Sequence, residues 1–284
     1  MERRLLGTSG LHVPAVGVGT ARVFNVRGDP DQARCEAVVD AALDRGSNLF
    51  DTSPMYGEAE RVLAVALADR RADSLVATKV WARTRAVGEQ QIEQALAWFG
   101  HVDLYQVHNA LGAEEYLPML AALRRAGRVR AVGVTHYLPS AYAELLDLMR
   151  RRQVDAVQVP YHPAERTAEQ DILPEADRLG IGVIVMTPFG SGRLLEHEPP
   201  DEALAPLASA GVHTWTQALL KWALSDPRVS CAIPATSRPE HMRSNAAAGE
   251  PPWLSIPQRR LIEDLVEASD GGRRASILEL SGRS

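Results

Sequence analysis

The stretch SLVATKVWARTRAVGEQQIEQALAWFGHVDLYQVH, residues 74–108, sets the pattern of the whole chain. Two short runs rich in Val, Ala and Leu, 74–80 and 102–108, flank a helical stretch, Glu89–Phe99, which Gly100 ends. Near-continuous apolar runs of this length are typical of strands buried on both faces, as in a parallel sheet. The stretch therefore predicts one strand–helix–strand unit.

The same alternation extends in both directions along the chain. Strand-like runs are expected at 15–20, 47–52, 74–80, 102–108, 129–135, 154–160, 181–187 and 229–234. Helices are expected at Asp31–Asp44, Glu58–Ala68, Glu89–Phe99, Glu114–Ala126, Ser140–Arg151, Ala168–Leu179, Thr214–Leu224 and Pro239–Ala248. Eight strands alternating with eight helices predict an α/β fold, the (β/α)8 or TIM barrel.

Both ends of the chain lie outside this alternation. The start, ERRLLGTSGLHVP, predicts a β-hairpin over residues 1–14 with Ser9-Gly10 as its turn, placed to cap the amino-terminal mouth of the barrel. A C-terminal tail at about 250–284 follows the last barrel helix and contains a helical stretch near Gln258–Glu267. A length of 284 residues suits one barrel domain over 1–284.

Composition narrows the class of protein. The net charge is −5 and Lys and Arg are scattered, which argues against a nucleic-acid partner because such binding needs a concentrated basic face. Two cysteines, Cys35 and Cys231, make no disulfide framework and are expected to be reduced and buried. Neither a signal peptide nor a membrane span is recognised, so we expect a cytoplasmic protein without a membrane partner.

Four polar residues stand at or just beyond the carboxyl ends of three expected strands. Asp51 and Tyr56 lie in SNLFDTSPMYG, Lys79 in LVATKV and His108 in DLYQVHN. These are the second, third and fourth strands, and in a barrel their carboxyl ends converge on one face. Singly, each residue is more typical of packing or of a structural ion pair. Together, they indicate one proton-transfer site.

The residue types suit reduction of a carbonyl. A free tyrosine has a pKa near 10, and a nearby ammonium such as Lys79 lowers that pKa by stabilising the phenolate. Asp51 would hold Lys79, and His108 could hydrogen-bond the substrate oxygen or share the proton. The set lacks a nucleophile–base pair and does not resemble a metal site. It fits hydride transfer from a cofactor.

The chain resembles the aldo-keto reductase superfamily. The motifs GVGT, FDTSPMYGEAE, ATKV, YQVHN, RAVGVTHY, DAVQVPYHP, MTPFGSGRL and IPATSRPEHMRSN occur in the family's order, from about Arg4 to Asn245. The resemblance implies a (β/α)8 barrel with a nicotinamide dinucleotide across its top. It also implies a catalytic tetrad of Asp51, Tyr56, Lys79 and His108, in which Tyr56 is the general acid.

The resemblance further implies a set of cofactor contacts. Thr135, His136 and Gln158 would bind the nicotinamide carboxamide, and Met186 stands where the family usually has an aromatic residue that stacks on the ring. The remaining segments would approach the pyrophosphate and the adenosine. In full, the implied cofactor-binding residues are Gly19, Thr20, Asp51, Thr135, His136, Gln158, Met186, Thr187, Pro188, Phe189, Gly190, Ser191, Gly192, Arg193, Ile233, Pro234, Ala235, Thr236, Ser237, His241 and Asn245.

The adenosine segment departs from the family pattern. Many members have Lys-Ser and a later Arg where this chain has Ala235-Thr236 and His241. Cations hold a 2′-phosphate best, so their loss weakens the case for NADPH, although Arg238 could compensate. NADP(H) is the expected cofactor, with NAD(H) as the alternative.

The substrate is expected to be a small carbonyl or alcohol compound, and the sequence leaves the oligomeric state open. Its pocket is expected to comprise Phe24, Met55, Tyr56, Trp81, His108 and Tyr137. Two other functions fit the same sequence. One is an NAD-linked dehydrogenase of a sugar or other alcohol, which runs the reaction backwards. The other is a non-catalytic subunit that senses the redox state of the cofactor, against which the complete tetrad argues.

Overall fold

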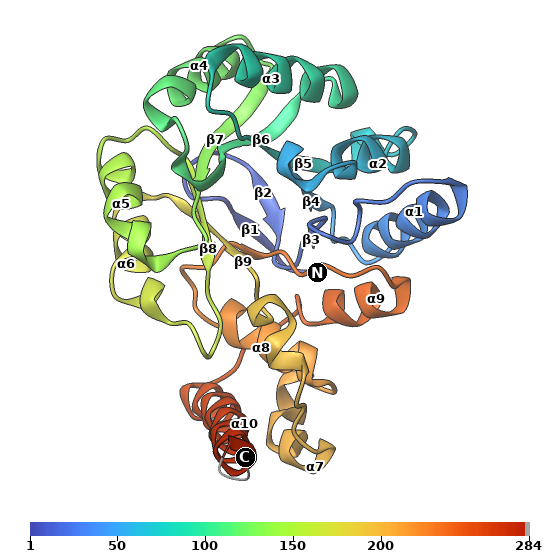
Figure 1. Cartoon of the computed structure of the whole chain (residues 1–284), viewed down its shortest axis with the longest axis vertical. Coiled ribbons are helices and arrows are strands. Elements are labelled where there is room, and N and C mark those ends of the chain that lie inside the picture. Colours follow the sequence, from blue (N-terminus) through green and yellow to red (C-terminus); the bar gives the residue numbers. More distant parts are fainter. Residues whose placement is uncertain (282–284) are drawn as a thin grey trace.

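Eight parallel strands form one sheet in chain order (Figure 1). The computed structural model describes residues 1–281, with side chains over 1–269, so that residues 282–284 of the expected tail lie outside it. The strands are β3 (Val18–Gly19), β4 (Leu49–Asp51), β5 (Leu75–Val80), β6 (Val102–Val107), β7 (Val129–Thr135), β8 (Ala156–Pro160), β9 (Gly182–Met186) and β10 (Cys231–Ala232).

The first and last strands meet and close the barrel. Val16 pairs with Ala232, and Gly19 pairs with Ala235, both in parallel. This contact needs glycine at position 19, because a Cβ there would lie 2.9 Å from the carbonyl oxygen of Ile233. The predicted (β/α)8 barrel is confirmed.

Eight main helices of the described residues surround the sheet (Figure 1). They are α1 (Asp29–Leu43), α2 (Ala59–Ala66), α3 (Arg85–Phe99), α4 (Ala113–Arg125), α5 (Tyr142–Arg150), α6 (Ile172–Leu179), α8 (Trp215–Leu224) and α9 (Pro239–Ala247). A short helix, α7 (Asp201–Leu204), precedes α8 and was not predicted. The helix α3 begins four residues before the expected start at Glu89, and its first turn carries an exposed Arg85–Glu89 pair instead of the apolar pattern that marks a helix.

An amino-terminal hairpin fills one end of the barrel, as expected. Its strands β1 (Arg3–Leu5) and β2 (His12–Pro14) pair in antiparallel register. The residues beside them join side chains from the barrel strands in a single interior cluster: Leu6, Leu11, Val13, Leu49, Ala77, Leu104, Ala131, Ala156, Ile184, Cys231 and Ile233. Because the amino-terminal mouth is closed, the opposite mouth is left for a ligand.

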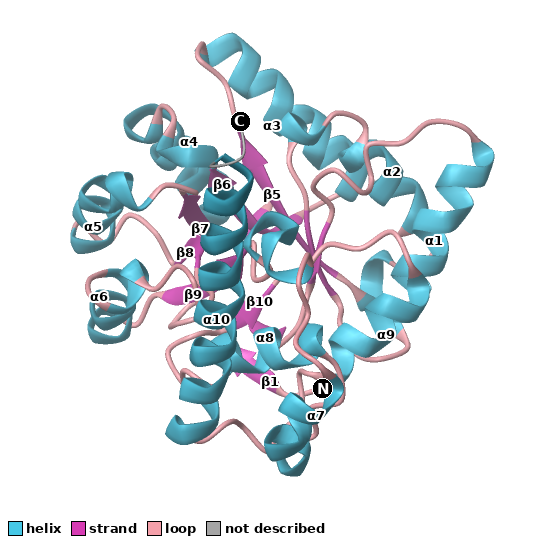
Figure 2. Cartoon of the chain, turned by 60° about the horizontal axis from the view of Figure 1, so that its bottom comes forward, coloured by secondary structure: helices cyan, strands magenta, loops and turns pink. Residues whose placement is uncertain are grey.

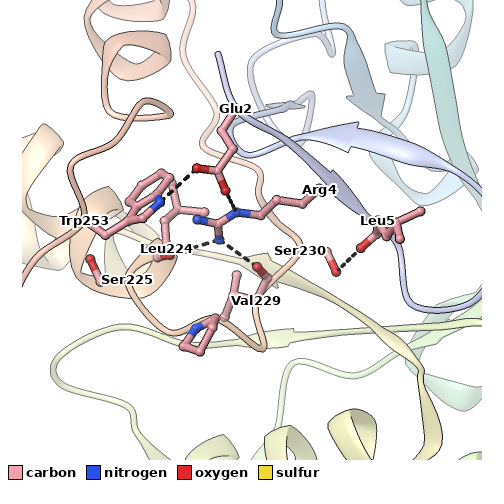
Figure 3. A pocket seen from close by; sticks show the side chains of 9 residues that line it. Glu2, Arg4, Leu5, Leu224, Ser225, Val229, Ser230 and Trp253 are labelled. Atoms are coloured by element: carbon pink, nitrogen blue, oxygen red, sulfur yellow. Dashed lines mark hydrogen bonds and ion pairs between the residues drawn. The ribbon is translucent and has the colours of Figure 1, made fainter.

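The segment after α9 is anchored at the closed end of the barrel. The Trp253 indole donates to Glu2 at 2.9 Å, and the Arg4 guanidinium lies 4.4 Å from the centre of the Trp253 ring. Figure 3 shows these residues around a cavity of about 460 Å³. Arg4 pairs with Glu2 at 2.7 Å and donates to the carbonyl oxygens of Leu224 and Val229, at 2.9 and 2.8 Å, so its charge and its donors are already satisfied.

The last helix, α10 (Ile256–Ser281), is much longer than the expected stretch near Gln258–Glu267. It lies beside α8 outside the ring of helices (Figures 1 and 2), where Trp222 donates to Glu263 at 2.9 Å. It also contacts the segments that follow β8 and β9, through Arg166–Glu263 at 2.6 Å and Gln258 Nε2–Pro206 O at 3.1 Å. Within the described residues, none of the helices is both long and apolar enough to cross a membrane.

Candidate active site

A short turn after β4 carries Tyr56 to the open mouth. Ser53 begins a 3-10 turn, Pro54–Tyr56, in which the Tyr56 amide donates to the Ser53 carbonyl at 2.9 Å. Pro54 suits the first position of such a turn because its φ is already restricted. The sequence SPMY thus fixes the distance of the phenol from Asp51, the last residue of β4.

A buried ion pair lies below Tyr56. Lys79 is completely buried, and its Nζ donates to Asp51 Oδ2 at 2.7 Å and to the Thr52 carbonyl at 2.8 Å. The other Asp51 oxygen accepts from Gln106 Nε2 at 3.3 Å. Neighbouring parallel strands therefore bring the acid and the ammonium into contact, as their positions at the strand ends predict.

Tyr56 and His108 complete the cluster. The Lys79 Nζ lies 5.1 Å from the centre of the Tyr56 ring, and the rings of Tyr56 and His108 lie 5.7 Å apart at 88°. His108 follows β6 directly and is buried, with its Nδ1 at 2.9 Å from Ser53 Oγ. The structure thus brings together all four residues singled out in the sequence.

The environment keeps Lys79 charged. Burial alone lowers the pKa of Lys79, but attraction to Asp51 and Tyr56 outweighs it, so the pKa is raised. Burial raises the pKa of Asp51, while Lys79 and the hydrogen bond from Gln106 oppose that shift. Because the two charged groups lie 2.7 Å apart, they titrate as one unit.

Tyr56 and His108 are both held in their neutral forms. Burial raises the pKa of Tyr56, and this outweighs the lowering by Lys79 on which the sequence argument relied. Burial, together with the charge of Lys79, lowers the pKa of His108 to about 3. At neutral pH Tyr56 therefore holds its proton, and His108 is a neutral hydrogen-bonding group.

A cleft of about 470 Å³ opens beside these residues at the carboxyl ends of the strands. It is lined by Gly19, Ala21, Arg22, Val23, Asp51, Tyr56, Tyr137, Gln158, Met186, Thr187, Pro188, Phe189, Ser191, Gly192, Leu195, Ile233 and Ala235. Most of these residues belong to the cofactor segments singled out in the sequence. Sequence reasoning missed Ala21, Arg22 and Val23, which lie in the loop after β3, and Leu195, which ends the 3-10 helix Gly190–Leu195 just beyond the motif.

One end of this cleft suits an amide group. Gln158 is buried, and its Oε1 has no hydrogen-bond partner within the described residues. A buried acceptor of this kind needs a donor, which a carboxamide NH₂ supplies. Nearby, His136 Nδ1 accepts from the Leu138 amide at 3.1 Å, which leaves the His136 proton on Nε2, and burial lowers the pKa of this ring.

The loop after β9 is strained where it lines the cleft. Thr187 and Ser191 have φ of 47° and 59°, in the left-handed region that residues other than glycine seldom adopt. For a β-branched residue such as Thr187 this backbone is costly, and such outliers gather at ligand-binding positions. The loop is thus shaped for close backbone approach to a ligand.

A second cavity of about 300 Å³ continues from the shared residues Phe189, Leu195 and Ala235. Its other lining residues are Glu198, Thr214, Thr216, Thr236, His241, Ser244 and Asn245. The described lining holds hydroxyls, one imidazole and one carboxylate, but neither Lys nor Arg. Arg238, considered above as a substitute cation, is exposed and does not line it.

Some of the expected residues lie away from both cavities. Phe24 is completely buried in the core between barrel and helices, because its aromatic ring packs there instead of facing the cleft as expected. Met55 and Trp81 are exposed by 47% and 39% without lining either cavity. Neither cavity is lined by His108, which was expected in the substrate pocket, or by the expected cofactor residues Thr20, Thr135, His136, Gly190, Arg193, Pro234 and Ser237.

Comparison with known proteins agrees with this architecture. The model of the aldo/keto reductase family matches residues 15–267. Methylglyoxal reductase YeaE from Escherichia coli is 30% identical over 262 residues, covering 88% of this chain and 90% of that protein. L-galactose dehydrogenase from Arabidopsis thaliana is 28% identical over 283 residues, covering 87% of this chain and 88% of that protein.

Solved structures share the fold. An aldo-keto reductase from Klebsiella pneumoniae in complex with NADPH aligns with a TM-score of 0.79 at 25% identity, over 94% of this chain and 95% of that one. The aldo-keto reductase AKR11C1 from Bacillus halodurans aligns with a TM-score of 0.77 at 23% identity, over 93% and 96%. With a family match over most of its length and the fold and cleft described above, the chain belongs to the aldo/keto reductase family.

Proposed function

We propose that this protein is an NADP(H)-dependent oxidoreductase that reduces an aldehyde or ketone to an alcohol, with Tyr56 as the general acid. One observation carries the proposal. The buried Lys79–Asp51 pair, at 2.7 Å, lies directly beneath a protonated phenol that lines the open cleft. Family membership supports the same class of reaction.

The residues of the cleft fit a nicotinamide dinucleotide. When bound, this cofactor supplies the hydride that the protein's own side chains cannot. Gln158 offers its unpartnered oxygen to the carboxamide, and Met186 offers a flexible apolar surface to the ring. The strained loop over 187–192 would present backbone groups to the pyrophosphate, and the second cavity would hold the adenosine.

The four clustered residues together transfer one proton to the substrate. As negative charge develops on the substrate oxygen, Tyr56 transfers its phenolic proton to that oxygen. The charge left on the phenolate is stabilised by the Lys79 ammonium, which Asp51 keeps in place. His108 is neutral and hydrogen-bonds the same substrate oxygen. In total, the carbonyl carbon gains one hydride from the cofactor and the carbonyl oxygen gains one proton from Tyr56.

Isotope transfer tests this function directly. NADPH carrying deuterium at C4 is incubated with the protein and a panel of aldehydes and ketones, and the alcohols are analysed by mass spectrometry. We expect deuterium on the former carbonyl carbon from only one of the two C4 positions, because the cleft binds one face of the ring. A protein-free mixture is the control. Failure to transfer the label to any compound of a broad panel would contradict the proposal.

The opposite direction is a second candidate. The adenosine cavity holds Glu198 and, in its described lining, no Lys or Arg, which favours a ribose hydroxyl over a 2′-phosphate. A relative of similar length is named L-galactose dehydrogenase. Titration of the protein with NADH and NADPH separates the two readings, because clear preference for NADPH would count against an NAD-linked dehydrogenase.

A further inference from the structure

Ser53 connects the two catalytic groups that would touch the substrate. It is completely buried and opens the turn that carries Tyr56. Its carbonyl accepts from the Tyr56 amide at 2.9 Å, and its hydroxyl oxygen accepts from the Met55 amide at 3.2 Å. The same hydroxyl lies 2.9 Å from His108 Nδ1.

The hydrogen-bonding capacity of Ser53 decides which way the last bond runs. A serine hydroxyl has one proton and two lone pairs. The Met55 amide uses one lone pair, and no acceptor other than His108 Nδ1 lies within reach of the Ser53 proton among the described residues. If Nδ1 carried the imidazole proton, the buried hydroxyl proton would be left without a partner, which is unfavourable.

A neutral imidazole has a proton on only one nitrogen. With Nδ1 accepting from Ser53, that proton must reside on Nε2, at the other edge of the ring. In this form Nε2–H can donate to a carbonyl oxygen. In the other form, an Nε2 lone pair would face the lone pairs of that oxygen and would repel it.

We propose that Ser53 is a positioning residue that holds His108 in the tautomer with its proton on Nε2, so that His108 can donate to the oxygen of the substrate. This inference rests on the proposed carbonyl reduction for its effect on the rate. The tautomer itself is a property of the protein alone. The Ser53 hydroxyl contacts His108 Nδ1 and the Met55 amide of the turn that carries Tyr56, and the tautomer reports on the first of these contacts alone.

The tautomer can be read by nitrogen-15 NMR of protein with labelled histidine, because protonated and unprotonated ring nitrogens resonate far apart. His108→Gln identifies the signal. We expect the wild type to show Nε2 protonated and Nδ1 unprotonated at pH 7. In Ser53→Ala both tautomers should appear, because the hydrogen bond that favours one of them is lost, and kcat should fall in proportion to the lost Nε2–H population, by about twofold or more. The Kd for NADPH should stay within about twofold.

Ser53→Thr is the matched control, because it keeps the hydroxyl. It should restore the Nε2–H tautomer and, in the same proportion, kcat. The wild-type spectrum remains decisive even if Ser53→Ala folds poorly. A wild-type signal with Nδ1 protonated, or an unchanged tautomer in Ser53→Ala, would overturn the inference, while deuteride transfer by the wild type would leave the proposed function standing. A changed tautomer with unchanged kcat would also overturn it.

Discussion

Replacing Lys79 by methionine removes one half of a buried ion pair and should strongly destabilise the protein. Methionine matches the length of the lysine side chain without its charge. In wild type, Lys79 Nζ and Asp51 Oδ2 are 2.7 Å apart and both side chains are almost fully buried. At an effective dielectric of about 20 the attraction at that distance is roughly 6 kcal/mol, largely offset by the cost of desolvating both charges.

After the substitution, Asp51 retains the hydrogen bond from Gln106, at 3.3 Å, and the weaker influence of the Gln158 amide, but has no cationic partner among the described residues. We expect the free energy of unfolding to fall by about 3–5 kcal/mol, the usual cost of leaving one buried charge unpaired. The double variant Lys79→Met/Asp51→Asn should recover about half or more of that loss, because it removes the unpaired charge. Urea unfolding, followed by tryptophan fluorescence, gives the free energy of unfolding of the wild type, both single variants and the double variant.

The sign of the pH dependence provides a second check on this substitution. Without Lys79, the folded-state pKa of Asp51 should rise further above its unfolded value, because burial is then opposed only by the weaker effects of Gln106 and Gln158. At a pH between the two values, Asp51 of the folded Lys79→Met protein binds a proton that Asp51 of the unfolded chain does not. The free energy of unfolding of the variant therefore increases as pH falls. The deficit relative to wild type should shrink from pH 8 to pH 5.5. A Lys79→Met deficit below about 1 kcal/mol, or one that grows as pH falls, would refute the reasoning.

Two further predictions follow from the site and from the closed end of the barrel. Because burial raises the pKa of Tyr56 above its ordinary value of 10 and lowers that of His108 to about 3, carbonyl reduction should show no step near pH 6.5 and should decline only above pH 10, whereas alcohol oxidation should accelerate as pH rises. Rate profiles in both directions check this, and a reduction rate that follows a group near pH 6.5 would contradict it. Trp253→Ala removes the contacts with Glu2 and Arg4, and should lower the free energy of unfolding by about 2–3 kcal/mol while kcat/KM stays unchanged. A changed kcat/KM in a folded Trp253→Ala protein would contradict this prediction and would show that the closed end of the barrel is coupled to the active site.

The barrel and the four clustered residues could be predicted from sequence because their signals are local. Apolar runs mark buried strands, and a polar residue at the end of such a run must lie at the carboxyl-terminal mouth. Asp51 and Lys79 meet in the structure for that reason, at the ends of the paired strands β4 and β5. The amino-terminal hairpin was also predicted correctly, from its turn residues Ser9-Gly10.

The features that the sequence did not predict depend on contacts between segments far apart in the chain. Arg22 and Leu195 both line the main cleft, yet neither lies in a motif, and only the folded loops bring them together. The pKa of Tyr56 is another case. The sequence shows a nearby lysine but not the extent of burial, which has the larger effect and reverses the expected direction. Phe24 was misplaced because an aromatic residue near a strand end can face either the cleft or the core.

The central claim is that Tyr56 donates the proton, and Tyr56→Phe tests it most directly. The substitution removes one oxygen and leaves the aromatic packing in place. Stopped-flow oxidation of bound NADPH in the presence of a carbonyl substrate measures the chemical step, and fluorescence titration measures cofactor affinity. Tyr142→Phe, which removes a buried hydroxyl in α5 away from the cleft, is the control. The account predicts that Tyr56→Phe loses about 10²–10⁴ in rate with little change in the Kd for NADPH, while Tyr142→Phe keeps the wild-type rate. A Tyr56→Phe protein that reduces carbonyls within a few-fold of the wild-type rate would contradict it.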